Sequence, residues 1–321
     1  MNEFFVHLRK DLRIQLSNSM LLLLLFGLVM LSIILAFNCY DRYTHSLASS
    51  YLVVSDHALE MARRVSLYQF WGVILGFFSL VFLVSSSFSL SHDKETGLAK
   101  YIMTYKASAS KMYFSKLAVM LFLVLVSCIL SLIVYVGVFL LLDSAMLGLD
   151  VLLLSMVFPF LTLACFVSIG LFISSLTSRK AAAAVLAVVV FFLVTFISMI
   201  STNVASMHMI WQHNGMPWEY VRPLVPIEYK LLIFSDPNML REGTAQLLGL
   251  TENSRAFDGL PFFSALGDAI VGLGMIGLSS LLGIMMLSRE RKDKNAFTWI
   301  VAGIKGLAKF TRIRTRSRAN N

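Results

Sequence analysis

Six stretches of the sequence contain no Asp, Glu, Lys or Arg over 19 to 26 residues each. They cover 20–38, 67–90, 117–142, 151–176, 181–203 and 269–288. A helix needs about 20 consecutive apolar residues to cross the hydrocarbon layer of a bilayer. The composition agrees, because 58% of the residues are hydrophobic and 14% are charged, against about 25% charged in soluble domains. The sequence excludes a soluble globular domain and predicts an all-α integral membrane protein with six transmembrane helices.

The distribution of charge predicts how these helices are oriented. If the N-terminus is cytoplasmic, the cytoplasmic segments hold 20 Lys and Arg but only 6 Asp and Glu, whereas the outer segments hold 7 and 12. Cytoplasmic loops of membrane proteins carry the excess of Lys and Arg. We therefore expect both termini to be cytoplasmic in a multi-pass protein of the cell (cytoplasmic) membrane. Because the positive charge follows one membrane side, it favours anionic lipids and not nucleic acid as its partner.

We divide the chain into three parts. Residues 1–19 are predicted to form an interfacial amphipathic helix, with a leucine stripe that includes Leu8 and Leu12 opposite Arg9 and Arg13. Residues 20–288 form the six-helix transmembrane domain, and 289–321 a basic cytoplasmic tail. In the fourth span, Pro159 predicts a kink.

The long outer loop of about 204–268, before the sixth span, has apolar patches of its own. These patches predict short re-entrant or surface-lying helices that cap the outer side. One of them is expected to begin near Asp236.

No motif for bond-making chemistry stands out in the chain. The sequence lacks the G-x-x-x-x-G-K-[ST] loop that cradles phosphates, and no Ser-His-Asp or HExxH arrangement is present. We expect a non-catalytic chain with no cofactor of its own. The six spans also lack the mid-membrane charged residue on which ion-coupled carriers and pumps depend, which disfavours a channel or secondary carrier.

The connection between the second and third spans predicts a short, charged, amphipathic helix. It begins with Asp93, Lys94 and Glu95, and an apolar ridge includes Leu98 and Ile102. Residues Ser108 to Lys111 read as a turn and the start of the next helix. A cytoplasmic segment held between two membrane helices can receive force from a soluble partner. The alternative is a basic loop that only satisfies the charge rule.

Three local patterns resemble the type-2 ABC exporter permease family. They are Lys94-Glu95-Thr96-Gly97-Leu98 after the second span, Phe114-Ser115-Lys116-Leu117 at the start of the third, and Ser174 to Ala182 after the fourth. The sequence departs from the family in the exchanged order of Thr96 and Gly97, and in the extended basic tail.

The resemblance implies partners for this chain and roles for some of its residues. It implies two cytoplasmic ABC ATPase subunits that bind ATP and Mg, and a second permease subunit that completes a homodimer or a heterodimer, of which we favour the homodimer. Arg179 and Lys180 would be secondary inner contacts. The coupling helix gripped by the ATPase would include Asp93, Lys94, Glu95, Thr96, Gly97, Leu98, Ile102 and Lys111.

The favoured function is a permease subunit that exports an amphipathic or hydrophobic substrate. The alternative is a membrane anchor, assembly or mechanical component for an outer-surface protein or a copper-enzyme maturation system. That alternative comes from a cluster in the outer loop, which comprises Met207, His208, Met209, His213 and Met216. Thioether and imidazole groups suit Cu(I), but His and Trp are also frequent in the belt of side chains at a membrane surface.

Overall fold

The computed structural model describes residues 8–13, 19–48, 56–97, 109–142, 147–250 and 261–290. Within these ranges the regular elements are all helices, and residues 8–13 are also helical. The named elements are α2 (Ser19–Ala48), α3 (Asp56–Glu95), α5 (Ala109–Leu142), α6 (Leu149–Ser155), α7 (Val157–Leu176), α8 (Lys180–Gln212), α9 (Trp218–Val221), η1 (Arg222–Leu224), α10 (Ile227–Ile233), η2 (Pro237–Arg241), α11 (Glu242–Leu247) and α12 (Ala265–Glu290).

In the described residues, five helices are long and apolar enough to cross a membrane. They are α3, α5, the pair α6 and α7, α8 and α12, and each contains one of the predicted spans. The first predicted span, 20–38, falls within the 30 residues of α2. The all-helical membrane architecture is therefore confirmed, while the count of six spans and the orientation of the termini stay predictions.

The described part of the N-terminal segment shows the predicted two-sided pattern. Leu8 and Leu12 pack against the main hydrophobic core, whereas Arg9 and Arg13 are exposed. The described residues do not include 1–7, 14–18 or 291–321. The boundaries of the three predicted parts, and the surface location of this helix, remain predictions.

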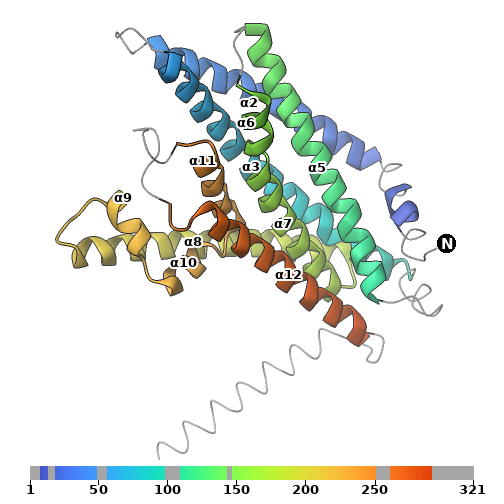
Figure 1. Cartoon of the computed structure of the whole chain (residues 1–321). Coiled ribbons are helices and arrows are strands. Elements are labelled where there is room, and N and C mark those ends of the chain that lie inside the picture. The colour runs from blue at the N-terminus through green and yellow to red at the C-terminus, as the bar shows by residue number, and fades with distance from the viewer. Residues whose placement is uncertain are drawn as a thin grey trace, which may run out of the picture.

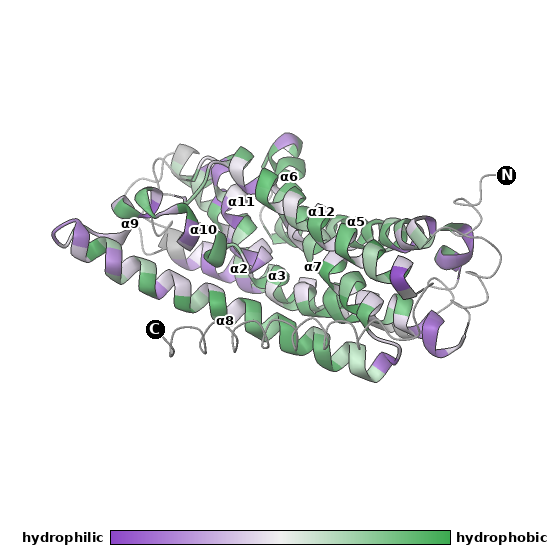
Figure 2. Ribbon diagram, turned by 90° about the horizontal axis from the view of Figure 1, so that it is seen from below, coloured by the Kyte–Doolittle hydropathy of each residue, from purple (hydrophilic) through white to green (hydrophobic). Residues whose placement is uncertain are grey.

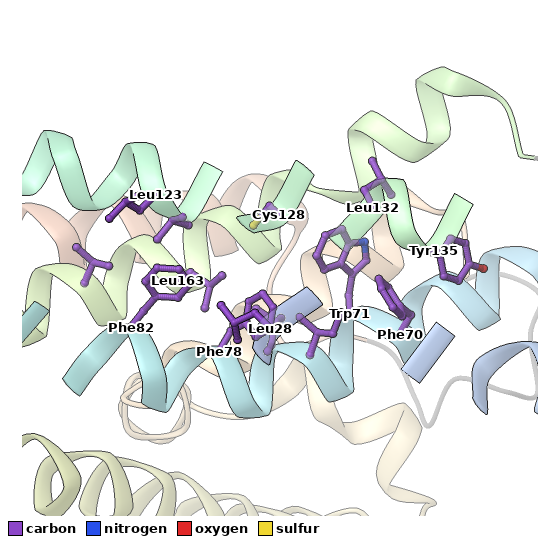
Figure 3. Packing of buried hydrophobic residues seen from close by; sticks show 14 of the residues in the cluster. Leu28, Phe70, Trp71, Phe78, Phe82, Leu123, Cys128, Leu132, Tyr135 and Leu163 are labelled. Carbon is purple, nitrogen blue, oxygen red and sulfur yellow. The ribbon is translucent and has the colours of Figure 1, made fainter. Parts of the chain in front are cut away.

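The main core lies between α2, α3, α5 and α7 (Figure 1). Long side chains of α3 point toward α5, where aromatic rings meet; the rings of Phe70 and Tyr135 have centroids 4.8 Å apart. Figure 3 shows this layer, in which Leu163 of α7 and Leu28 of α2 lie among the side chains of α3 and α5. Because lipid is as apolar as these side chains, helix packing here depends on close van der Waals contact.

Helices α7 and α3 approach each other closely at Gly170. A Cβ atom added to Gly170 of α7 would lie 2.5 Å from the backbone oxygen of Leu83 and would collide with the Ser86 hydroxyl. Real Cβ atoms do not tolerate such contacts. Glycine at this position is therefore what allows α3 and α7 to form the most extensive helix pair of the bundle.

Pro159 interrupts the fourth span, as the sequence predicts. Proline has no backbone N–H and its ring clashes with the carbonyl four residues earlier, which is that of Ser155, where α6 ends. The Ser155 hydroxyl donates to Leu152 O at 2.7 Å and accepts from the Trp71 indole of α3 at 3.0 Å. A buried tryptophan N–H thus finds its partner at the break.

The chain between α8 and α12 contains the predicted short helices. The Asp236 side chain accepts a hydrogen bond from the Asn238 backbone N–H at 3.0 Å and caps η2, so the predicted helix start near Asp236 is confirmed. Ser79 donates to the Asn238 side chain at 2.9 Å. Since Ser79 lies in the middle of the predicted span 67–90, the segment 227–250 reaches into the bundle like a re-entrant loop.

Helix α8 packs less tightly than its neighbours. Apolar side chains on its outer face, among them Val185, Phe192 and Phe196, are exposed. Figure 2 shows α8 along one edge of the molecule, apolar over most of its length and more polar toward α9. Such a face suits lipid or another membrane helix.

Candidate functional site

The last turn of α3 carries the first three residues of the predicted coupling segment. The prediction put Asp93, Lys94 and Glu95 at the start of a separate helix, and this is wrong, because α3 continues without a break to Glu95. Just past the end of the helix, Gly97 has a φ of +74°, in the left-handed region that favours glycine. The apolar run 67–90 is thus extended by a polar turn that projects from the span.

Asp93 belongs to a buried ion network that joins three elements. Its carboxylate lies 2.7 Å from the Lys116 ammonium of α5, which in turn lies 3.6 Å from the Asp11 carboxylate. Ser115 donates a further hydrogen bond to Asp11 at 2.9 Å. All three charged residues are buried. One lysine therefore ties the N-terminal helix, the end of α3 and the start of α5 together.

Lys94 and Glu95 connect the same turn to the ends of two further helices. The Lys94 ammonium donates to Ser175 O, near the C-terminus of α7, at 2.5 Å. The Glu95 carboxylate accepts from the backbone N–H of Lys180, the first residue of α8, at 3.2 Å. Helix C-termini leave carbonyls unpaired and attract cations, whereas N-termini attract anions. Lys94 and Glu95 thus each carry the charge that stabilises the helix end they contact.

Ser174 adds a neutral contact between α3 and α7. Its hydroxyl accepts hydrogen bonds from the backbone N–H groups of Leu90 and Ser91, at 2.8 and 2.7 Å. We call the set formed by Asp93, Lys94 and Glu95 with Asp11, Lys116, Ser174, Ser175 and Lys180 the tripeptide junction. The junction couples the polypeptide after Glu95 to α5, to the α7–α8 turn and to the N-terminal helix at once.

The remaining predicted contacts are distributed around the junction. Thr96 and Gly97 are exposed just beyond it, and Lys111 is exposed in the first turn of α5. Arg179 is exposed beside Lys180 at the N-cap of α8. Leu98 and Ile102 lie outside the described residues. No role for these side chains in binding a partner is tested by the structure.

Four residues of the junction had no role of their own in the sequence analysis. Lys116 was noted only as part of the start of the third span, Ser174 and Ser175 only within the stretch after the fourth span, and Asp11 was not singled out. For Asp11, the available signal was an acidic side chain on a mainly basic amphipathic segment. This signal predicts that a cation from another part of the fold pairs with Asp11, but it does not identify that cation.

The structure does not bring the Met and His side chains of the outer loop together in one metal-binding site. Met207 is exposed, whereas Met209 is buried, so the two thioethers leave α8 in different directions. The His213 Nδ1 atom is hydrogen-bonded to Met209 O at 2.9 Å, and the rings of His208 and Tyr229 lie 6.3 Å apart. Met216 is exposed. In the described ranges, no group of three or more His, Cys, Asp or Glu is placed to hold a metal ion.

A search of curated proteins finds no match to this chain. A protein-family model does match, over residues 45–227, and its description is ABC-2 family transporter protein. The matched part runs from within α2 to the start of α10 and includes the whole tripeptide junction apart from Asp11. Because this is more than half of the chain, and because the structure supplies the apolar helices that a multi-pass transporter needs, the chain belongs to the ABC-2 family of transporter membrane proteins.

Proposed function

We propose that this chain is the membrane-spanning permease subunit of an ABC exporter, driven by separate ATPase subunits that bind the segment after Glu95. The tripeptide junction carries the proposal. It links that segment to α5, α7 and α8 through two charged helix caps and one ion network. A push on this segment would therefore move several membrane helices together. Family membership supports an ATP-binding partner.

The proposed arrangement has two copies of the ATPase, with ATP and Mg bound there, and two copies of this chain. The N-terminus, the junction and the C-terminus lie on the cytoplasmic side of the cell membrane. Exposed apolar side chains along α8 and α2, such as Phe192 and Ile34, leave surface for lipid or for a second subunit. The exported substrate is amphipathic or hydrophobic, because the polar groups inside the spans are chiefly serine hydroxyls.

The observations favour this function over the copper-maturation alternative. His213 already has a backbone partner, and the thioethers of Met207 and Met209 face different surroundings. A titration of Cu(I) against the wild type and the His208→Ala/His213→Ala variant separates the two functions. Equal affinities dismiss the copper role, and a large loss of affinity in the variant supports it.

Co-purification with a stand-alone ABC ATPase, co-expressed as the candidate partner, tests the main proposal. Replacement of residues 98–108 by a Gly/Ser stretch of equal length should abolish binding of the ATPase. The matched control replaces 251–258 in the same way, on the side that the charge distribution assigns to the exterior, and should retain the ATPase. Retained binding and turnover in the first variant would refute the assignment.

Labelling of single cysteines in intact cells tests the orientation. Thr96→Cys and Gln212→Cys, both at exposed positions near opposite ends of the bundle, should differ in their reaction with a membrane-impermeant maleimide. We expect Gln212→Cys to react and Thr96→Cys to react only after lysis. The reverse pattern would place the junction outside the cell and overturn the proposed function.

A further inference from the structure

Asp268, in the first turn of α12, carries a buried carboxyl group that has no partner among the described residues. The residue is fully buried, with 0% of its surface exposed. Among the residues that the structure describes, neither carboxylate oxygen has a hydrogen-bond partner. The backbone N–H of Asp268 donates to Ser264 O at 2.9 Å, so the residue does contribute to the start of the helix. Its side chain, by contrast, has only the partial positive charge of the helix N-terminus to offset a negative charge.

The charged group that acts on Asp268 is Glu242 of α11, which has the same sign. The Glu242 carboxylate already accepts a hydrogen bond from the buried Arg222 guanidinium and one from the Phe262 backbone N–H at 3.5 Å. Arg222 also stacks on the Phe262 ring, with its guanidinium carbon 4.2 Å from the ring centroid. Arg222 and Glu242 thus form a neutral pair, and an ionised Asp268 would add an unbalanced negative charge.

The other elements packed against α12 are α5, α7 and η2, and none places a cation against Asp268. On α7, the Cys165 thiol donates to Gly272 O at 3.4 Å, one turn further along α12. On α5, Tyr113 meets α12 at Ser280 and Gly283, far along the helix from Asp268. On η2, the charge of Arg241 acts on Glu242. In the described ranges, Asp268 therefore has acidic and neutral neighbours.

Burial of an ionised carboxylate is unfavourable unless a cation or several hydrogen bonds compensate for the loss of water. Asp268 has neither. We propose that Asp268 is a binding site for one proton, that it is a neutral acid while α11 packs on α12, and that release of the proton undocks α11. The proton is the smallest positive ligand, and it removes the repulsion from Glu242.

The position of Asp268 gives this proton a mechanical consequence. Glu242 and Gln246, four residues apart on one face of α11, both bind the backbone that leads into α12. The Gln246 side chain donates to Phe263 O at 2.7 Å, and Glu242 accepts from Phe262. When Asp268 is ionised, two carboxylates face each other across this contact. The segment 227–250 would then separate from the start of α12, which is itself a candidate span.

Hydrogen exchange of the full-length protein in lipid nanodiscs, from about pH 5 to about pH 9, tests the proposal. The readout is the protection factor of the amides of residues 242–250, corrected for the intrinsic pH dependence of exchange. In the wild type, protection should fall with rising pH by up to about tenfold per pH unit, the limit for release of one proton. In Asp268→Asn, an isosteric neutral variant, it should stay constant. Glu228→Gln, at an exposed acidic position of α10, should retain the wild-type response.

Two further measurements keep the test decisive. If Asp268→Asn does not fold, Glu242→Gln replaces it, because removal of the neighbouring charge frees Arg222 to pair with Asp268 and should flatten the pH response. An unchanged slope in whichever of these variants folds would overturn the proposal. So would a loss of the wild-type pH response on addition of Na⁺ or K⁺ at high pH, because the site would then take a metal cation.

Discussion

Two regions of this protein bury charged side chains, and they treat them in opposite ways. At the tripeptide junction, Lys116 lies between two carboxylates, and Lys94 and Glu95 meet helix ends of the opposite partial charge. In the α11–α12 contact, Arg222 pairs with Glu242, and Asp268 is left with a like charge as its neighbour. In the first arrangement, each charge has a partner of opposite sign. The second is stable only while a proton neutralises Asp268.

This difference fits the work proposed for each region. A junction that passes force from a partner to several helices must not separate when it is pushed. A segment inserted among α3, α7, α8 and α12 can act as a movable element only if its contacts are conditional. The comparison yields four predictions about stability, from the largest expected effect to the smallest.

Substitution of Lys116 should have the largest effect. Lys116→Met leaves the buried carboxylates of Asp93 and Asp11 without their cation, and breaking a buried ion network from one side costs about 3–5 kcal/mol. Thermal and denaturant unfolding in detergent micelles measures the loss.

Two variants accompany this measurement. Lys111→Met removes an exposed lysine one turn earlier in the same helix and should change stability by less than about 1 kcal/mol. Addition of Asp93→Asn to Lys116→Met should recover part of the loss, because one of the uncompensated charges disappears. If the double variant is the less stable of the two, the junction is not held by charge pairing.

Substitution of Gly170 tests the tight crossing of α3 and α7, the helix pair that carries the junction. Gly170→Ala forces a methyl group against the Leu83 backbone oxygen, and overpacking of this kind costs about 1–3 kcal/mol. Gly137→Ala on α5 is the matched control, since nothing lies within 4 Å of the added Cβ. The control should stabilise its helix by up to about 1 kcal/mol. Equal unfolding temperatures for both variants would contradict the tight crossing.

Much of the fold could be predicted from the sequence because it depends on single runs of residues. A stretch of 20 or more residues without charge identifies a membrane helix wherever its neighbours lie, and Pro159 and Asp236 act on their own backbone. The segment around Glu95 was assigned to the wrong helix because a charged turn can extend a membrane helix beyond the lipid as readily as it can end one. Hydropathy alone does not distinguish these outcomes.

The contacts of both charged regions could not be predicted in the same way. Lys116 and Asp11 come from segments far apart in the sequence, and their pairing depends on how the helices pack. Asp268 directly precedes the predicted span 269–288 and was taken as part of the loop, whereas α12 begins earlier, at Ala265. Side chains at the ends of spans are therefore where sequence-based assignment is weakest.

Ser174 should make a smaller contribution to the junction than Lys116. Ser174→Ala removes the acceptor of the Leu90 and Ser91 N–H groups, and loss of a neutral hydrogen bond costs about 1 kcal/mol. Ser288→Ala, at an exposed position where the hydroxyl bonds only to its own helix at Met285 O, should leave the unfolding temperature unchanged. If Ser174→Ala also has no effect, the neutral contact adds nothing to the charged caps.

The smallest effect is expected at Asp236, and it should depend on pH. Burial raises the pKa of this carboxyl above its ordinary value, although hydrogen bonds from Asn238 and the charge of Arg241 oppose the shift. Because the pKa is higher in the folded protein than in the unfolded chain, Asp236 favours folding most at acidic pH, and this contribution is lost as the pH rises through the folded-state pKa.

Asp236→Asn keeps an acceptor for the Asn238 N–H, since Asn and Asp cap helices about equally well, but it cannot ionise. The variant should match the wild type near pH 4 and become the more stable protein at neutral pH, as measured by unfolding temperature across this range. A neutral-pH loss of stability in the variant would mean that the Asp236 charge holds the segment 227–250 in place. In that case a charge interaction at Asp236 would hold one end of the segment, as charge pairs hold the junction. Only the contact between Glu242 and Asp268 could then separate when the pH changes.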